Sequence, residues 1–279
     1  MAIKLMYITN RPEIVRIAEK AGVDRIFVDL EYIGKADRQG GKDTVQSKHT
    51  IDDVKAVAQV ISTAELLVRV NPMHEATDAY TSSQEEIDSA IDAGADILML
   101  PFFKTVKEVK DFLSTVGGRV KTMLLVETPE AVECIDEILM LEGIDFIHIG
   151  LNDLSLGYGM KFMFELLADG TVERLCNKFR AKEIPYGFGG IASLDGGMVP
   201  GRVVLKEHYR LGSSCAILSR SFCNADKLSD LDLIQTIFTT GVKEIRKLET
   251  LCREYIDFFI KNKEELKQTV YNIVSEGVG

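Results

Sequence analysis

Short apolar runs rich in β-branched residues alternate along the chain with segments in which apolar positions recur every three or four residues. The apolar runs predict β-strands, and each segment between them has one apolar face, as a helix that covers a sheet requires. The sequences AGVD, AGAD, EGID and LGSS each end a predicted helix with glycine and lead into the next strand. The predicted strands are residues 3–9, 25–31, 65–71, 97–102, 122–128, 145–151, 185–191 and 215–222.

This order of elements favours an α/β fold of the (β/α)8 type, the TIM barrel, over an open doubly wound sheet. We expect residues 1–224 to form the barrel domain and residues 225–279 to form C-terminal helices. Those helices pack either on the barrel or on a neighbouring subunit, and both alternatives stay open at this stage. Residues 32–49 and 73–82 are long connections after predicted strands, which suggests a lid or a substrate contact.

Composition narrows the class of ligand. The 279 residues are 46% hydrophobic, enough for a large core, and carry a formal net charge of −10, which argues against binding nucleic acid or an anionic membrane. No window is apolar for the roughly 18 residues that a membrane helix needs, and the N-terminus lacks the features of a signal peptide. We therefore expect a cytoplasmic protein that binds small molecules. Without C-x-x-C spacing, we expect the five cysteines to be reduced and buried.

Polar residues gather where the predicted strands end. In a barrel these ends meet around one cavity, so their side chains are candidates for chemistry. Carboxylates without cysteine or paired histidine point to a hard cation such as Mg²⁺ or Mn²⁺. The residues at the strand ends are Asp29, Glu31, Arg69, Asn71, Glu127, Asn152 and Asp153.

Each carboxylate also has a purely structural interpretation. Glu127 precedes Thr128 and Pro129, a good helix start, and Asp153 would serve as a helix N-cap. Asp29 and Glu31 would pair with Arg69 across neighbouring strands. What favours a metal site is the meeting of Glu127 and Asp153 in one predicted cavity.

Two segments carry a resemblance to a known family. LLVETPEAVECIDEIL at 124–139 and GIDFIHIGLNDLSLGYG at 143–159 resemble paired motifs of the HpcH/HpaI aldolase and citrate lyase β-subunit family. FVDLE, LVRVNP and GADILMLPFFKTVKEV resemble its intervening segments, in the same order, so that the resemblance spans roughly residues 3–222. It implies a metal-dependent carbon–carbon lyase of the aldolase type. Its substrate would be a pyruvate-like or oxaloacetate-like enolate, from a 4-hydroxy-2-oxoacid for example.

The resemblance also implies roles for individual residues. Glu127 and Asp153 would hold the divalent metal, and Arg69 would contact the keto oxygen of the oxoacid. Asp29 and Glu31 would orient Arg69 or a water molecule. The substrate carboxylate would be held by backbone N–H groups at a helix start, in the segment Gly150, Leu151, Asn152 and Asp153.

Two positions depart from the family pattern. Tyr32 stands where the aldolase branch has a histidine that acts as acid and base, and Leu125 stands where related aldolases carry glutamine. The nearest replacement for the histidine is His49, at the far end of the long second loop, although a histidine near a helix start is often an ordinary surface residue. These departures leave the substrate and the direction of the reaction open.

The second loop is basic in an otherwise acidic protein. Lys35, Arg38, Lys42 and Lys48 would clamp an anionic aldehyde, a polycarboxylate or a phosphate, or would form a solvated loop. The glycines at 187–190 lack the spacing of a dinucleotide-binding motif. They would instead make room for substrate.

Other functions stay open. A citrate lyase-like enzyme acting on an acyl-coenzyme A, or a synthase, is a variant within the same class. A barrel without catalysis that serves as a binding subunit is a rival, because the expected histidine is absent at position 32. The resemblance further implies a homo-oligomer, a trimer or hexamer, in which subunits contribute to each other's sites.

Overall fold

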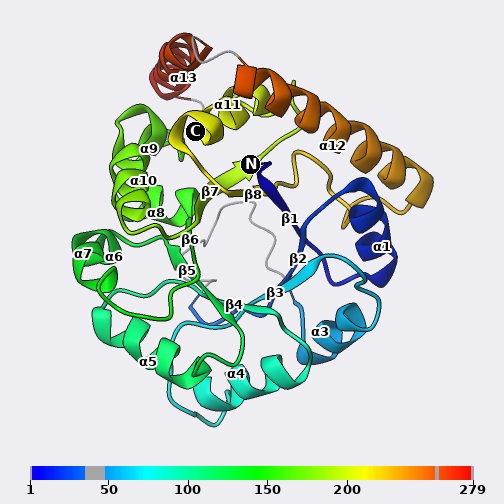
Figure 1. The fold of residues 1–279 in the computed structure, drawn as a ribbon, viewed down its shortest axis with the longest axis vertical. Coiled ribbons are helices and arrows are strands. Elements are labelled where there is room, and N and C mark those ends of the chain that lie inside the picture. Colours follow the sequence, from blue (N-terminus) through cyan, green and yellow to red (C-terminus); the bar gives the residue numbers. More distant parts are fainter. Residues whose placement is uncertain (1, 35–47, 255–257, 278–279) are drawn as a thin grey trace.

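The computed structural model describes residues 2–34, 48–254 and 258–277, in which strands and helices alternate (Figure 1). The strands are β1 (Lys4–Ile8), β2 (Arg25–Asp29), β3 (Glu65–Arg69), β4 (Ile97–Leu100), β5 (Lys121–Val126), β6 (Phe146–Ile149), β7 (Tyr186–Ile191) and β8 (Cys215–Leu218). The helices are α1 (Pro12–Ala21), α3 (Ile51–Ala58), α4 (Ser83–Asp92), α5 (Val106–Val116), α6 (Pro129–Glu133), α7 (Ile135–Ile138), α8 (Leu151–Gly157), α9 (Glu165–Ala168), α10 (Thr171–Ala181), α11 (Gly201–Leu211), α12 (Leu231–Glu254) and α13 (Phe258–Ser275).

The strands form one closed parallel barrel. Each strand pairs with the next along the chain, and β8 pairs with β1 to close the sheet. The helices surround this barrel as an outer ring (Figure 1). The prediction of a (β/α)8 barrel is therefore confirmed.

Alternate residues of each strand face opposite sides of the barrel wall. On β2, for example, Ile26 and Val28 belong to the large core between the strands and the helices, whereas Phe27 faces the barrel interior. A second, smaller cluster fills that interior. It consists of Met6, Phe27, Leu67, Ile97, Met99, Met123, Leu125 and Cys215.

The same alternation turns polar side chains into the mouth of the barrel. Asp29 follows Phe27 by two residues, Arg69 follows Leu67 by two, and Glu127 follows Leu125 by two, so all three continue the inward-facing rows. The register between β2 and β3 places Asp29 directly beside Arg69. Carboxyl-terminal strand ends thus carry the charged groups, while the interior beneath them is apolar.

Arg69 and Asp29 form a two-point ion pair across that register. The Nε and Nη2 atoms of Arg69 donate to the two carboxylate oxygens of Asp29 at 2.8 and 2.7 Å. Although burial acts to lower the pKa of Arg69, the carboxylates of Asp29 and Glu31 raise it overall. The guanidinium is therefore a fixed positive charge at the barrel mouth.

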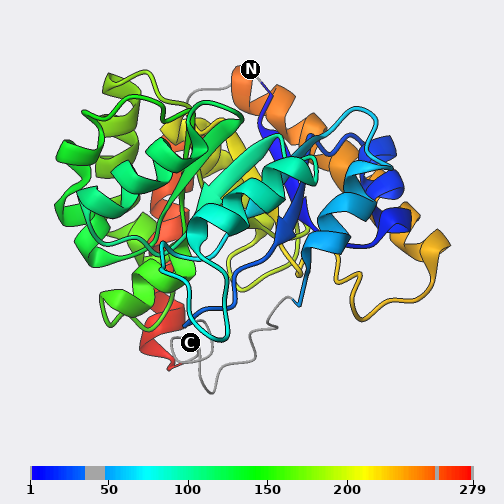
Figure 2. The same cartoon turned by 90° about the horizontal axis from the view of Figure 1, so that it is seen from below.

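The C-terminal helices pack on the barrel of their own chain. α12 lies against α1 and α11, and α13 lies against α9 and α11 (Figure 2). The Asn262 side chain donates to the Val203 carbonyl at 3.0 Å and to the Glu207 carboxylate at 2.9 Å, which ties α13 to α11. In the part of the chain that the structure describes, no helix combines the length and apolarity needed to span a bilayer.

Some predicted boundaries are wrong. Helix does not begin at residue 225 but at Leu231, and β8 ends at Leu218 rather than at residue 222. The chain turns there, because the Phe222 N–H donates to the Ser219 carbonyl at 2.9 Å. All five cysteines are free thiols, yet Cys134 is half-buried rather than buried.

A double-mutant cycle tests the Arg69–Asp29 pair. Asp29→Asn leaves the guanidinium with less compensating charge and is expected to lower the free energy of unfolding by about 3 kcal/mol. Arg69→Met has a similar effect, and the double variant should lose clearly less than the sum of the two. The same cycle on the exposed pair Lys107 and Asp111 is the control and should show little coupling. Additive losses at Asp29 and Arg69, measured by urea unfolding, would contradict a coupled pair.

Acid should weaken the fold through His208 on α11. Burial is the main cause that lowers the pKa of His208 from 6.5 to about 3, and the ring stacks on Phe188 with 3.9 Å between the ring centroids. Because the folded pKa is depressed, the unfolded chain binds the proton first, and stability falls as pH drops from 6.5 towards 3. Between about pH 7.5 and pH 5 this costs about 2 kcal/mol. Urea unfolding at the two pH values measures this. The free energy of unfolding of His208→Asn should fall by about 2 kcal/mol less than that of the wild type. An equal fall in both proteins would show that His208 is not the group responsible.

Candidate active site

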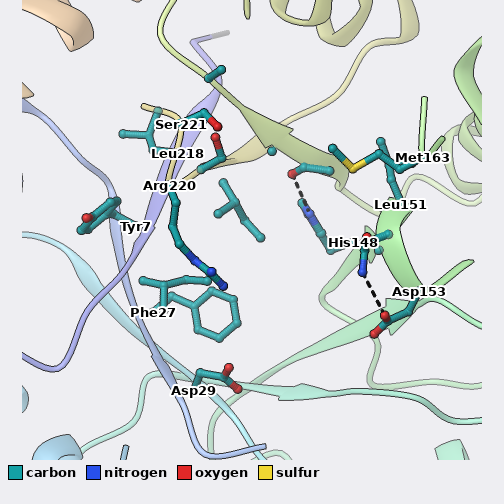
Figure 3. A pocket seen from close by; sticks show the side chains of 18 of the residues that line it. Tyr7, Phe27, Asp29, His148, Leu151, Asp153, Met163, Leu218, Arg220 and Ser221 are labelled. Atoms are coloured by element: carbon teal, nitrogen blue, oxygen red, sulfur yellow. Dashed lines mark hydrogen bonds between the residues drawn. The ribbon is translucent and has the colours of Figure 1, made fainter. Parts of the chain in front are cut away.

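A cavity of about 720 Å³ opens at the carboxyl-terminal mouth of the barrel (Figure 3). Most of the predicted site residues line it, although they come from five different strands or loops. Glu31 does not line it but contacts Arg69, and Lys35 and Arg38 lie outside the described residues. The predicted residues that do line the cavity are Asp29, His49, Arg69, Glu127, Gly150, Leu151, Asn152 and Asp153.

Glu127 is a buried carboxylate held by backbone. It is 3% exposed, and its Oε1 accepts from the Phe102 N–H at 3.0 Å. Phe102 has a φ of 47°, a conformation that a side chain of this size rarely adopts. Burial, and then the charges of Glu31 and Asp153, raises the pKa of Glu127 to about 8, although Arg69 opposes the shift. Burial is thus the main reason that this carboxyl group binds its proton more tightly than usual.

Gly150 makes room for Glu127 at the start of α8. A Cβ atom at position 150 would lie 2.7 Å from Oε2 and 2.8 Å from the Cβ of Glu127. Gly150 is also the N-cap of α8 and offers no side chain to cap it. Asp153 lies in the first turn of this helix, where its Oδ1 accepts from the Asn152 amide at 3.2 Å.

Arg69 connects the carboxylates of β2 with the cavity. Besides its two bonds to Asp29, its Nη1 lies 3.3 Å from Oε2 of Glu31. Asp29 and Glu31 therefore do pair with Arg69, as the structural interpretation of these two carboxylates predicted. Arg69 still lines the cavity, so these contacts orient the guanidinium without removing it from the site.

His49 lines the cavity and is not an isolated surface residue. Its Nδ1 accepts from the backbone N–H of Asp29 at 3.0 Å, which places the proton of the neutral ring on Nε2. The next residue, Thr50, caps α3 in a reciprocal capping box with Asp53. The helix start therefore fixes where His49 enters the site.

Tyr32 does not take the place of the absent histidine. Its side chain is 52% exposed, does not line the cavity, and packs on the ring of Tyr80 at 5.3 Å. No residue from 73–82 lines the cavity either, so the substrate contact expected for that loop is not seen. Leu125 does line it, as an apolar side chain.

Sequence reasoning missed His148 and Arg220, which both line the cavity (Figure 3). His148 Nε2 contacts the Gly189 carbonyl at 3.2 Å, and burial lowers the pKa of His148 to about 4, so that the ring is neutral. Its position two residues before Gly150, in an inward-facing row, was a signal that could have identified it. Arg220 carries no such signal, because the sequence predicts a single strand over residues 215–222.

The donor set suits a hard divalent cation. Glu127 and Asp153 both line the cavity and offer carboxylate oxygens, the ligand type that such a cation prefers. Among residues 2–34, 48–254 and 258–277, no group of three or more histidine, cysteine, aspartate or glutamate side chains is arranged to hold a metal. Two carboxylates completed by water and substrate oxygens is the arrangement that Mg²⁺ prefers.

The chain is similar in sequence to known aldolases. The chain is 26% identical over 106 residues to a hydroxypyruvate/pyruvate aldolase from Roseovarius nubinhibens. The aligned region covers 38% of this chain and 40% of that protein. It is 24% identical over 213 residues to a 4-hydroxy-4-methyl-2-oxoglutarate aldolase from Chaetomium globosum, which covers 64% of this chain and 72% of the relative.

The fold has solved counterparts. An HpcH/HpaI aldolase from Desulfitobacterium hafniense superposes with a TM-score of 0.61 at 19% identity, over 88% of this chain and 93% of the other. The family model described as HpcH/HpaI aldolase/citrate lyase matches residues 4–163. The sequence-based prediction of the family, and with it of the carbon–carbon lyase class that the family's name states, is confirmed: the chain belongs to the HpcH/HpaI aldolase/citrate lyase family.

Proposed function

We propose that this protein is a divalent-metal-dependent aldolase that forms or cleaves a bond to the methyl carbon of a pyruvate-like oxoacid. The observation that supports this best is the meeting of Glu127, Asp153 and Arg69 in one cavity. Acidic side chains there suit Mg²⁺ or Mn²⁺, and the guanidinium suits the oxygen of an enolate. Bound metal would supply Lewis-acid stabilisation of the charge that develops on the keto oxygen.

In the forward direction the methyl carbon of the oxoacid loses a proton, and the resulting enolate carbon attacks an aldehyde carbon. The aldehyde oxygen gains a proton, so that the product is a 4-hydroxy-2-oxoacid that retains every other atom. Arg69 faces the enolate oxygen as a cation already oriented by Asp29 and Glu31. Because these bonds exist before substrate arrives, little reorganisation is needed in the transition state.

The substrate carboxylate would lie at the start of α8. Gly150 and Leu151 line the cavity, and the first turn of α8 lacks a side-chain cap. Backbone N–H groups of Leu151 and Asn152 are therefore proposed to donate to the carboxylate. Lys35 and Arg38 stay predicted contacts for the aldehyde partner.

His49 is the proposed acid and base. Its Nδ1 is occupied by the Asp29 N–H, so Nε2 is the atom that exchanges protons in the cavity. His148 is less suited to this task, since its lowered pKa of about 4 makes it a weak base and its Nε2 contacts the Gly189 carbonyl.

Two further expectations belong to this proposal. A homo-oligomer, a trimer or hexamer, is expected from the family resemblance, and analytical ultracentrifugation tests its size. A cytoplasmic location likewise stays a prediction. The alternative to the aldolase reaction is a citrate lyase-like reaction on an acyl-coenzyme A, which the absence of histidine at position 32 keeps open.

Metal binding and enolisation should fail together when the carboxylates are removed. With Mg²⁺ or Mn²⁺ present, NMR should show exchange of the pyruvate methyl protons with deuterium. Glu127→Gln and Asp153→Asn should weaken Mn²⁺ binding by about 100-fold and slow exchange by about 1,000-fold, because each removes one charged ligand. Calorimetry measures the first effect and NMR the second.

Glu130→Gln is the matched control, since Glu130 lies on the same connection but is exposed and pairs with Lys104. It should change neither quantity. Wild-type protein that shows no metal-stimulated exchange, or Glu127→Gln with unchanged Mn²⁺ affinity, would contradict the proposed metal-dependent aldolase.

Replacement of His49 tests the proton-transfer step. His49→Asn should lower kcat/KM for cleavage of a 4-hydroxy-2-oxoacid by about 100- to 10,000-fold, the usual contribution of general acid–base catalysis. Mn²⁺ affinity should change little, because the ring is not a proposed ligand. A variant with nearly wild-type kcat/KM would assign the proton transfer to another group.

A further inference from the structure

The cavity is larger than the proposed oxoacid site requires. Its volume of about 720 Å³ lies in the range of about 300–1,000 Å³ that proteins use for drug-sized ligands, whereas pyruvate has only three carbons. Arg69, Glu127 and the start of α8 account for the part formed by β3, β5 and β6. The rest of the cavity is available to the second substrate, the electrophile.

That remaining part lies at the carboxyl ends of β7, β8 and β1. Asn10 follows Ile8 by two residues and Ser219 follows Ile217 by two, and both isoleucines pack on the inward-facing cluster. Asn10 and Ser219 therefore continue inward-facing rows, as Asp29 and Glu127 do on their strands. Both line the cavity.

Glycine brings backbone close to this region. Gly189 has a φ of +50°, and a Cβ there would lie 2.6 Å from the Leu151 side chain. A Cβ on Gly190 would lie 3.3 Å from that of Ser219, so the ends of β7 and β8 approach each other closely. Loops after the seventh and eighth strands are where barrels commonly bind phosphate groups.

Arg220 supplies positive charge at the same place. It lies in the turn after β8, and its side chain extends into the cavity towards Phe27, with Asp29 beyond (Figure 3). Arg69 and Arg220 both line the cavity, so Arg220 adds a second guanidinium to its wall. Lys48 also lines the cavity, and Asp226 contributes one carboxylate on the β8 side.

We propose that Arg220, with Ser219 and Asn10, binds an anionic group of the electrophile, either a phosphate or a carboxylate. A guanidinium with neighbouring hydroxyl and amide donors suits the planar or tetrahedral oxygens of such groups. The proposal rests on the proposed aldolase function, because it concerns the partner to which the enolate adds. The reacting aldehyde carbon would face Arg69, and the anion would face β8.

Anion binding tests this directly. Oxalate, a planar mimic of the pyruvate enolate, is first bound with Mg²⁺, and inorganic phosphate or propionate is then titrated by calorimetry. Wild-type protein should bind at least one of the two, and the choice identifies the anionic group. Arg220→Gln should weaken that binding by at least about 10-fold and Arg220→Lys by less, as expected for loss of a charge-assisted hydrogen bond. Arg16→Gln, an exposed arginine on α1, is the matched control and should bind as wild type does.

Paired aldehydes give the kinetic counterpart. The kcat/KM for glyceraldehyde 3-phosphate is compared with that for glyceraldehyde, and the kcat/KM for succinic semialdehyde with that for butanal. Arg220→Gln should reduce the ratio of kcat/KM for the anionic aldehyde to that for the neutral one by at least about 10-fold. If neither anion binds, or if Arg220→Gln binds it as tightly as wild type, the proposal is overturned. The pyruvate proton exchange uses no second substrate, so its failure would strike the aldolase function instead.

Discussion

The ion pair between Arg69 and Asp29 allows a group of carboxylates to lie at the mouth of an otherwise apolar barrel. Asp29, Glu31 and Glu127 are all buried, and burying charge is costly unless it is paired and hydrogen-bonded. The parallel register of β2 and β3 places the two partners side by side, so the barrel itself fixes the geometry. The remaining charges of the site are arranged around this guanidinium.

Asp29 also links the electrostatic part of the site to the proposed proton-transfer part. Its carboxylate binds Arg69, while its backbone N–H binds the ring of His49. The histidine expected at position 32 would lie in the same loop, yet Tyr32 turns outward onto Tyr80. One strand end therefore orients both the cation and an imidazole, although the imidazole comes from the other end of the loop.

The sequence predicted the barrel and the convergence of Asp29, Arg69, Glu127 and Asp153, because strand alternation and strand order together determine which side chains meet. It named His49 as a candidate but could not show what holds the ring at the mouth, since that is a hydrogen bond to the backbone of Asp29, twenty residues earlier. Nor did it predict that Arg220 enters the cavity. The sequence predicts one strand over residues 215–222, whereas β8 ends at Leu218 and the chain turns at Ser219 to Phe222.

The cavity is assembled from two sets of strand ends, with the proposed oxoacid contacts after β3, β5 and β6 and Arg220 beyond β8. The barrel wall joins the two sets. If Arg220 binds the electrophile as proposed, changes in the connections after β7 and β8 would alter which electrophile is accepted while the carboxylates and Arg69 stay in place. In evolutionary terms, such a scaffold permits new partners to be acquired without rebuilding the chemistry that activates the oxoacid.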